Sequence, residues 1–89
     1  MLHYNIIVKG RVQGVWFRKY TKDAANSYDL KGFVQNLEDG DVYIEAEGTE
    51  ENLRHFMKWL EKGSPMSEVT EVNISEGDFV GFTDFEITR

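Results

Sequence analysis

The chain has 89 residues, of which 40% are hydrophobic and 29% charged, and its lack of cysteine excludes disulfides, thiolate metal sites and a cysteine nucleophile. This length supports one domain over residues 1–89, and Lys9 interrupts the N-terminal apolar run too early for a signal peptide or a membrane span. The net charge of −6 argues against general binding to nucleic acid or to anionic membranes, so we expect the protein to bind neither. Because a domain this small without disulfides suits a reducing compartment, we expect it in the cytoplasm.

The N-terminal third is predicted to form a strand and then a helix. Residues 4–9 alternate with period 2 and are apolar on both faces at Ile6 and Ile7, which predicts a strand near the middle of a sheet, ending at Gly10. A helix is expected from Phe17 to about Tyr28, because apolar residues there follow helical spacing and should face the core. This stripe comprises Phe17, Tyr20, Thr21, Ala24, Ala25 and Tyr28.

The middle of the chain is predicted to form a hairpin and a second helix. Residues 33–37 and 42–47 should pair as antiparallel strands, because the Asp39-Gly40 pair between them favours a tight turn. Thr49 is expected to cap the second helix, which Gly63 ends. The apolar residues of this helix, expected in the core, are Leu53, Phe56, Met57 and Leu60.

The C-terminal residues complete the predicted sheet. Residues 69–74 form an expected fourth strand and residues 77–81 a turn, and the alternation of Phe85 and Ile87 with polar neighbours predicts a short last strand. The order βαββαβ with an extra C-terminal strand predicts an α+β, ferredoxin-like sandwich, in which two helices cover one face of an antiparallel sheet. Such a fold by itself names no function.

The segment from Gly10 to Arg18 has the features of an anion site. Gly10 and Gly14 permit backbone angles that turn successive N–H groups inward, and the N-terminus of the following helix adds unpaired donors. The planar guanidinium of Arg18 could bind two oxygens of a phosphoryl group. The segment matches neither of the usual nucleotide-binding patterns, G-x-x-x-x-G-K-[ST] and G-x-G-x-x-G.

The charge distribution is compatible with such a site. Residues 1–22 contain no Asp or Glu but five basic residues, namely Lys9, Arg11, Arg18, Lys19 and Lys22. The same segment also fits an ordinary turn, with Arg18 as a surface cation and Val12, Val15 and Phe17 in the core. These residue patterns leave both interpretations open.

Two motifs resemble the acylphosphatase family. Residues 10–18 match its signature G-x-V-Q-G-V-x-F-R at every specified position. The family pattern G-F-V-x-N-x-x-x-G-x-V, followed by a glycine six positions later, is matched by residues 32–42 and Gly48. Ser64 and Ser67 depart from the Pro and Ala that are usual in the family, but they lie outside both motifs.

The resemblance implies a monomeric hydrolase that converts an acyl phosphate into a carboxylate and inorganic phosphate without metal or cofactor. It implies that the phosphoryl oxygens are held by the Arg18 side chain and by backbone amides, and that Asn36 positions the attacking water. The amides concerned are those of Gln13, Gly14, Val15, Trp16, Phe17 and Arg18. The phosphate of the substrate would itself accept the proton of the water, so that no side-chain base is needed.

Two other functions compete with this interpretation. A phosphate-binding module would need Arg18 and the loop but no water-positioning residue, so the presence of Asn36 favours catalysis. An RNA-binding sheet is suggested by Lys31-Gly32-Phe33, but the acidic composition opposes it.

The remaining polar and aromatic residues receive no catalytic role. His3 and His55 lack partners at metal-ligand spacing and are expected at the surface or at an edge. The numerous acidic side chains are expected to be solvated. Trp16 could shape the mouth of the site or pack beneath it, and core packing is favoured.

Overall fold

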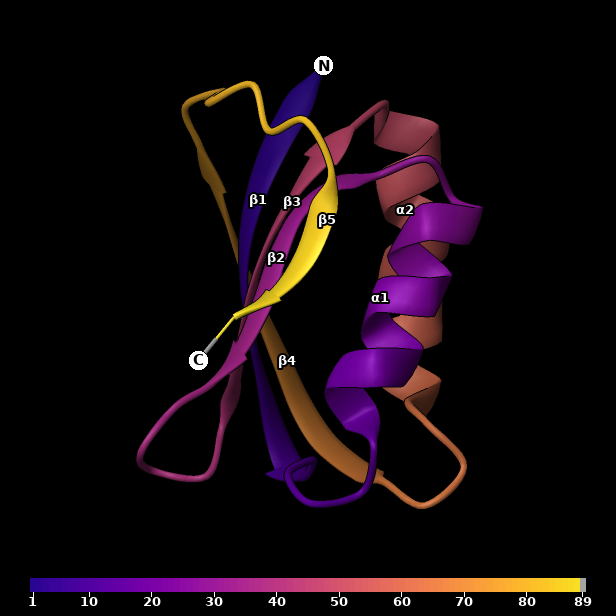
Figure 1. Ribbon diagram of the computed structural model, residues 1–89, viewed down its shortest axis with the longest axis vertical. Coiled ribbons are helices and arrows are strands. Elements are labelled where there is room, and N and C mark those ends of the chain that lie inside the picture. The colour runs from indigo at the N-terminus through magenta and orange to yellow at the C-terminus, as the bar shows by residue number, and fades with distance from the viewer. Residues whose placement is uncertain (89) are drawn as a thin grey trace.

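A computed structural model describes residues 1–88, and its elements follow the expected βαββαβ order with an additional C-terminal strand (Figure 1). The elements are β1 (Leu2–Arg11), α1 (Phe17–Ser27), β2 (Lys31–Asn36), β3 (Val42–Gly48), α2 (Glu50–Lys62), β4 (Glu68–Gly77) and β5 (Phe85–Thr88). The α+β prediction is therefore confirmed. β1 and β4 extend beyond their predicted ends, because residues beyond those ends pair between the two strands, as His3 does with Gly77 and Arg11 with Glu68.

The five strands form one sheet in the order β4-β1-β3-β2-β5. β1 lies inside the sheet, between β4 and β3, as its apolar residues on both faces predicted. The first four strands pair antiparallel as expected, whereas β5 runs parallel to β2, so the expectation of an antiparallel sheet was wrong for this strand and the sheet is mixed. β4 ends opposite His3 and β2 begins near the same end of the sheet, so a chain that crosses there must enter β5 in the direction of β2.

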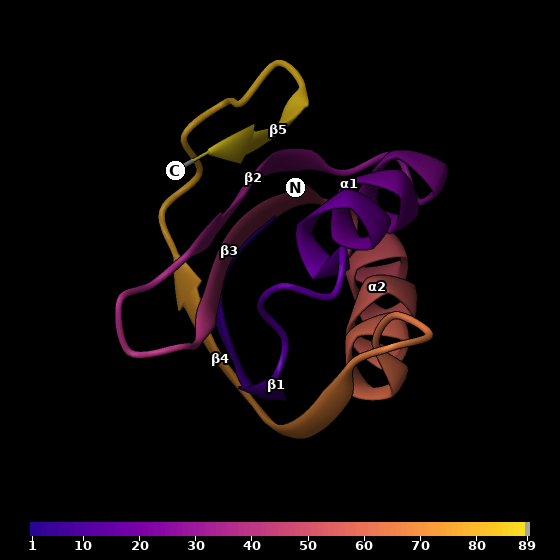
Figure 2. The same cartoon turned by 60° about the horizontal axis from the view of Figure 1, so that its bottom comes forward.

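Both helices cover one face of the curved sheet (Figure 2). The core between the layers contains fully buried side chains from both, including Ile6, Val8, Val34, Val42, Ile44, Phe17, Leu53, Phe56 and Leu60. Tyr20 is 43% exposed, so its expected place in the core was wrong. It lies at the margin of the α1 stripe, whose buried residues are Phe17, Thr21, Ala24 and Ala25.

The ends of α2 follow the predicted chemistry. The Thr49 side chain accepts a hydrogen bond from the Asn52 amide at 3.1 Å, and Glu50 and Glu51 lie in the first turn. Gly63 adopts a φ of 77° directly after the helix, a conformation that disfavours side chains with a Cβ. No helix among residues 1–88 has the length and apolar character needed to cross a membrane.

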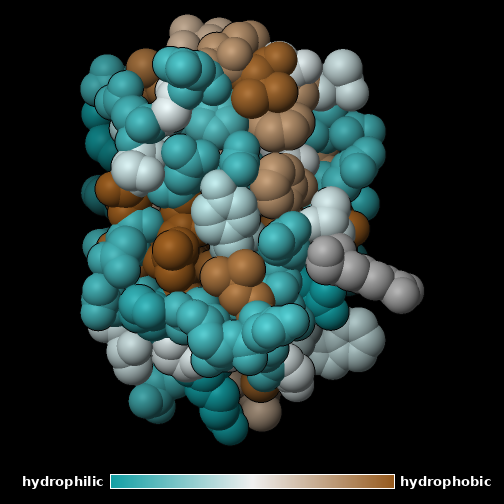
Figure 3. Space-filling view, turned by 90° about the vertical axis from the view of Figure 1, so that its left-hand side faces the viewer, coloured by the Kyte–Doolittle hydropathy of each residue, from teal (hydrophilic) through white to brown (hydrophobic). Residues whose placement is uncertain are grey.

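The other face of the sheet is open and mostly hydrophilic (Figure 3). One part of it differs from expectation, because His3 is only 4% exposed and Glu47 only 2%. The His3 Nδ1 lies 2.6 Å from a Glu47 carboxylate oxygen, while Nε2 lies 3.0 Å from oxygens of Asn5 and Glu45. The prediction of a histidine at the surface or at an edge is therefore wrong for His3, and that of a solvated acidic side chain is wrong for Glu47. Both can be buried because the hydrogen bond between them offsets the cost of removing each group from water.

Glu47 also anchors the segment that leads into β5. Its carboxylate accepts hydrogen bonds from the amides of Val80, Gly81 and Phe82, at 2.5, 3.0 and 3.0 Å. Burial alone would raise the pKa of Glu47, but the hydrogen bonds from His3 and from these amides outweigh it and lower the pKa. Burial lowers the pKa of His3, whereas hydrogen bonds to Glu47 and Asn5 and the neighbouring carboxylates raise it above the usual value.

We expect Glu47→Gln to lower the free energy of unfolding by about 2 kcal/mol near pH 6, because charge-assisted hydrogen bonds are lost. The stability contributed by Glu47 is present above its unfolded pKa of 4.5 and is lost as the pH falls through its lowered folded pKa. The contribution of His3 is full below its unfolded pKa of 6.5 and is lost as the pH rises through its raised folded pKa. The effect should therefore be largest between pH 4.5 and 6.5.

Urea unfolding at several pH values measures this effect. Glu86→Gln, an exposed acidic position on β5, is the matched control and should change stability little. Equal unfolding energies for Glu47→Gln and Glu86→Gln would contradict the anchoring role of Glu47.

Candidate active site

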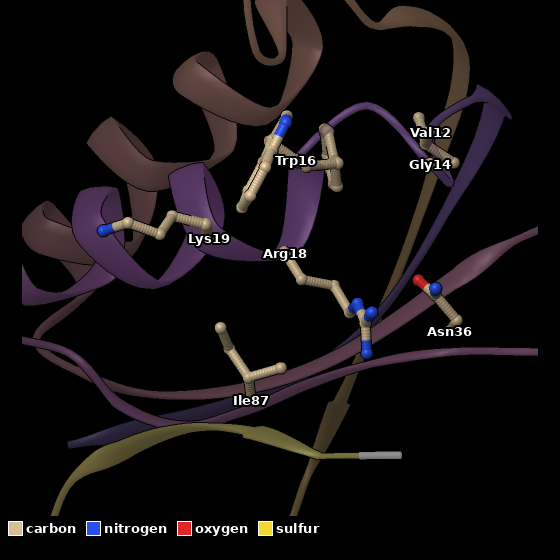
Figure 4. Close-up of a pocket in the computed structure, with 8 residues that line it drawn as sticks. Val12, Gly14, Trp16, Arg18, Lys19, Asn36 and Ile87 are labelled. Carbon is tan, nitrogen blue, oxygen red and sulfur yellow. The ribbon is translucent and has the colours of Figure 1, made fainter.

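A pocket of about 470 Å³ opens where the loop after β1, the start of α1, the end of β2 and β5 meet (Figure 4). It brings together residues that are far apart in the sequence. The lining residues are Val12, Gly14, Trp16, Phe17, Arg18, Lys19, Asn36 and Ile87. The predicted residues Arg18 and Asn36 therefore share one pocket with part of the predicted loop.

The loop between β1 and α1 contains unusual backbone conformations. Gly10 has a φ of 124°, and a Cβ at this position would collide with the carbonyl of Glu68 on the paired strand β4. Gly14 has a φ of 72°, and Trp16 has a φ of 61° even though it carries a large side chain. These conformations turn the chain sharply out of β1 and directly into α1.

The amides of this turn are available to a ligand. Within residues 1–88, the amides of Gln13, Gly14, Val15 and Trp16 donate no hydrogen bond. Trp16 is the N-cap residue of α1 but provides no side-chain cap, and the first turn of the helix contains no acidic residue. The unpaired N–H groups and the positive end of the helix dipole therefore favour an anion at this point.

Arg18 extends from the first turn of α1 into the pocket toward Asn36 (Figure 4). Its Nη1 lies 3.4 Å from the carbonyl oxygen of Thr88, a weak hydrogen bond that links the guanidinium to β5. Thr88 is held in turn by a hydrogen bond from its hydroxyl to Gln35 on β2, at 3.1 Å. No acidic side chain among residues 1–88 pairs with Arg18, so its donors can face an anionic ligand.

Asn36 is the last residue of β2 and shares the inner face of the sheet with the buried Val34. Its Oδ1 is buried and has no hydrogen-bond partner within residues 1–88. Because a buried polar atom without a partner is unfavourable, this oxygen is a natural binding point for a water or a ligand donor. The side chain lies in the pocket close to the guanidinium end of Arg18 (Figure 4).

The side chain of Gln13 has a positioning role that the sequence did not indicate. Its Nε2 donates to the carbonyl oxygens of Leu37 and Asp41, both at 2.8 Å. These bonds tie the loop to the hairpin that directly follows Asn36. Nothing in the spacing of Gln13 distinguishes this role, because its partners are 24 and 28 residues away along the chain.

An ion pair strengthens the same hairpin. The Lys9 ammonium donates to the Asp41 carboxylate at 2.7 Å, and this hydrogen bond and charge raise the pKa of Lys9. Lys9 lies on β1, just before the loop, so the pair provides a second link between the loop and the hairpin.

Trp16 does not pack in the core, contrary to expectation, and is 75% exposed. The left-handed backbone at this position directs the side chain outward, while Phe17, the next residue, is buried. The indole thus forms part of the pocket wall (Figure 4).

The second histidine, His55, does not line this pocket. His55 is exposed and stacks on Tyr28, with ring centroids 6.0 Å apart. Among residues 1–88, no group of three or more His, Cys, Asp or Glu side chains is arranged to hold a metal ion.

Comparisons with known sequences and structures all match this chain to acylphosphatases. The sequence model of the acylphosphatase family matches residues 4–87. An acylphosphatase from Bacillus licheniformis is 49% identical over 89 residues, covering 99% of each chain. The crystal structure of an acylphosphatase from Bacillus subtilis has a TM-score of 0.98 at 43% identity, covering 100% of both chains. That of an acylphosphatase from Coxiella burnetii has a TM-score of 0.95 at 33% identity, covering 98% of this chain and 92% of the other.

Inorganic phosphate should stabilise the protein if the loop binds it. At a phosphate concentration of 100 times Kd, the expected gain is about 2.7 kcal/mol, which a thermal melt detects as a higher Tm. Arg18→Ala should weaken phosphate binding by about 10-fold to 100-fold, because hydrogen bonds between charged groups are lost.

Lys19→Ala is the matched control, because it removes the same charge from the neighbouring residue. The Lys19 ammonium points away from Arg18 and pairs with Asp23 at 3.1 Å (Figure 4). This variant should keep most of the phosphate-induced rise in Tm. Equal losses in the two variants would show that binding depends only on general charge.

Proposed function

Since the chain belongs to the acylphosphatase family and is a hydrolase of that class, we propose that its loop and Arg18 hold the phosphoryl group while Asn36 positions the attacking water. The observation that carries this division of roles is the buried, unpartnered Oδ1 of Asn36, which shares one pocket with Arg18. An anion-binding module would have no need of such a group.

The phosphoryl group is held mainly by donors that are already in place. The amides from Gln13 to Arg18 and the guanidinium of Arg18 offer hydrogen bonds to its oxygens. In phosphoryl transfer the protein supplies chiefly positioning and stabilisation of the charge on these oxygens. Donors that need not reorganise during the reaction stabilise this charge most effectively.

Asn36 suits the water better than a carboxylate would. Its amide group can both accept and donate hydrogen bonds, so it can orient a water without adding negative charge. An aspartate at the same place would repel the anionic substrate. The links from Gln13 and Lys9 to the hairpin beyond β2 support the position of Asn36 relative to the loop.

The reaction balances without a covalent intermediate on the protein. The water oxygen forms a bond to phosphorus, and the bond between phosphorus and the acyl oxygen breaks, with its electron pair leaving on the carboxylate. One proton of the water passes to a phosphate oxygen, so that an acyl phosphate dianion and water give a carboxylate and dihydrogen phosphate. Because a carboxylate is a good leaving group, the step requires no general acid.

We propose that the protein works in the cytoplasm as a monomer of one domain and that it acts without metal. None of the residues that line the pocket is a carboxylate, a histidine or a cysteine. Amide and guanidinium donors suit an anion and are poor metal ligands.

The first test is hydrolysis of benzoyl phosphate by the purified protein in the presence of a chelator. We expect unchanged turnover on addition of the chelator, measured by release of inorganic phosphate. Loss of turnover that returns when a divalent metal is added would refute the metal-free proposal, and no turnover in either condition would refute the catalytic role.

The second test separates the role of Asn36 from that of Arg18. Asn36→Ala should lower kcat about 10²-fold to 10³-fold, by analogy with the loss of one transition-state donor, while phosphate still raises the Tm. Arg18→Ala should lower turnover by a similar factor and also weaken phosphate binding by about 10-fold to 100-fold.

Asn73→Ala removes the same amide from an exposed position on β4 and should behave as the unmodified protein. If Asn36→Ala and Arg18→Ala lost phosphate binding to the same extent, the proposed division between water and phosphate would be wrong.

A further inference from the structure

We propose that Trp16 and Ile87 form a subsite for the acyl group and that this subsite favours bulky apolar acyl phosphates, aromatic ones in particular. The inference rests on the proposed function, because it concerns the part of the substrate that the loop and Arg18 do not bind. Both side chains line the same pocket as Arg18 and Asn36.

Trp16 and Ile87 are exposed apolar side chains. Trp16 is 75% and Ile87 41% exposed, although both are large and apolar, and they come from different elements, the loop before α1 and strand β5. Two such side chains on one pocket wall leave apolar surface in water that a ligand can cover. An indole offers a flat face on which an aromatic ring can stack.

The backbone of Trp16 is in the left-handed region. Its φ of 61° is an unfavourable conformation for a bulky residue, and it directs the side chain to the pocket mouth instead of the core. Such conformations persist where the surrounding structure enforces them, and they concentrate at binding sites. Here the conformation places the indole beside the phosphate-binding amides.

The direction of the reaction places the acyl group on the side of Trp16 and Ile87. In phosphoryl transfer the attacking and leaving oxygens lie roughly in line on opposite sides of phosphorus. With the water at Asn36, the acyl oxygen must leave on the opposite side. Trp16 and Ile87 lie on the side of Arg18 that faces away from Asn36, where the acyl group would extend (Figure 4).

Size and charge narrow the class of acyl group. The pocket of about 470 Å³ is larger than a phosphate of five heavy atoms requires, so space remains for an acyl chain or ring. No acidic side chain lines the pocket among residues 1–88, and the Lys19 ammonium points away from Arg18 and pairs with Asp23 (Figure 4). The remaining wall therefore suits a neutral, apolar acyl group.

The test compares benzoyl phosphate with acetyl phosphate, which share the phosphoryl group and differ in the acyl group. For each variant we measure the ratio of kcat/KM for benzoyl phosphate to that for acetyl phosphate, relative to the same ratio for the unmodified protein. This double ratio cancels the intrinsic reactivities of the two substrates.

Trp16→Ala should lower the ratio about 2-fold to 12-fold, the range expected from loss of one aromatic contact, mainly through a higher KM for benzoyl phosphate. Ile87→Ala, outside the loop, should lower it in the same direction. Phe79→Ala is the control, because it truncates an exposed aromatic residue that does not line this pocket, and it should leave the ratio unchanged.

The outcomes distinguish the subsite from the proposed function. An unmodified protein that hydrolyses both substrates, with ratios unchanged in Trp16→Ala and Ile87→Ala, would overturn the subsite alone, even if Trp16→Ala distorted the loop and slowed both reactions equally. An unmodified protein that hydrolyses neither substrate would overturn the proposed function and the subsite with it.

Discussion

The N-terminus of α1 is left without a side-chain cap, and the rest of the site is arranged around this feature. The second helix of the same chain shows the ordinary solution, in which Thr49 caps the first turn and acidic residues complement the dipole. At α1 the N-cap residue is Trp16, whose side chain accepts no hydrogen bond from a backbone amide, and the first turn carries Arg18 and no acidic residue. Donors that α2 satisfies internally are thus available to a phosphoryl group at α1.

Such a loop needs support from elements outside it, because unpaired amides do not hold their own geometry. Gln13 bonds to the hairpin after β2, and Arg18 touches the backbone of β5. β5 is in turn reached through the segment whose amides bond to Glu47 at the other end of the sheet. The buried pair of His3 and Glu47 is therefore part of the structure that brings β5, with Ile87 and Thr88, to the pocket.

Local patterns in the sequence were sufficient for the helices, the hairpin and the cap at Thr49, since each depends on neighbouring residues. They failed where a side chain is satisfied by a distant partner, as with His3 and Glu47, which are 44 positions apart. The sequence left Trp16 between the mouth of the site and the core, because it lies in the loop before the helix, where residue spacing does not set the direction of a side chain. Only its left-handed backbone, set by the tertiary path of the loop, directs it outward.

The place of Asn36 depends on strand register more than on its own chemistry. Side chains alternate across the sheet, and Asn36 shares the inner face with Val34, while Gln35 faces the other way and bonds to Thr88. A slip of one residue between β2 and β3 would present Gln35 to the pocket and expose Val34 to solvent. The burial of Val34 therefore stabilises the register in which Asn36 lies in the pocket with Arg18. The pairing of β2 with β3 thus determines both the burial of Val34 and the position of the proposed water at Asn36.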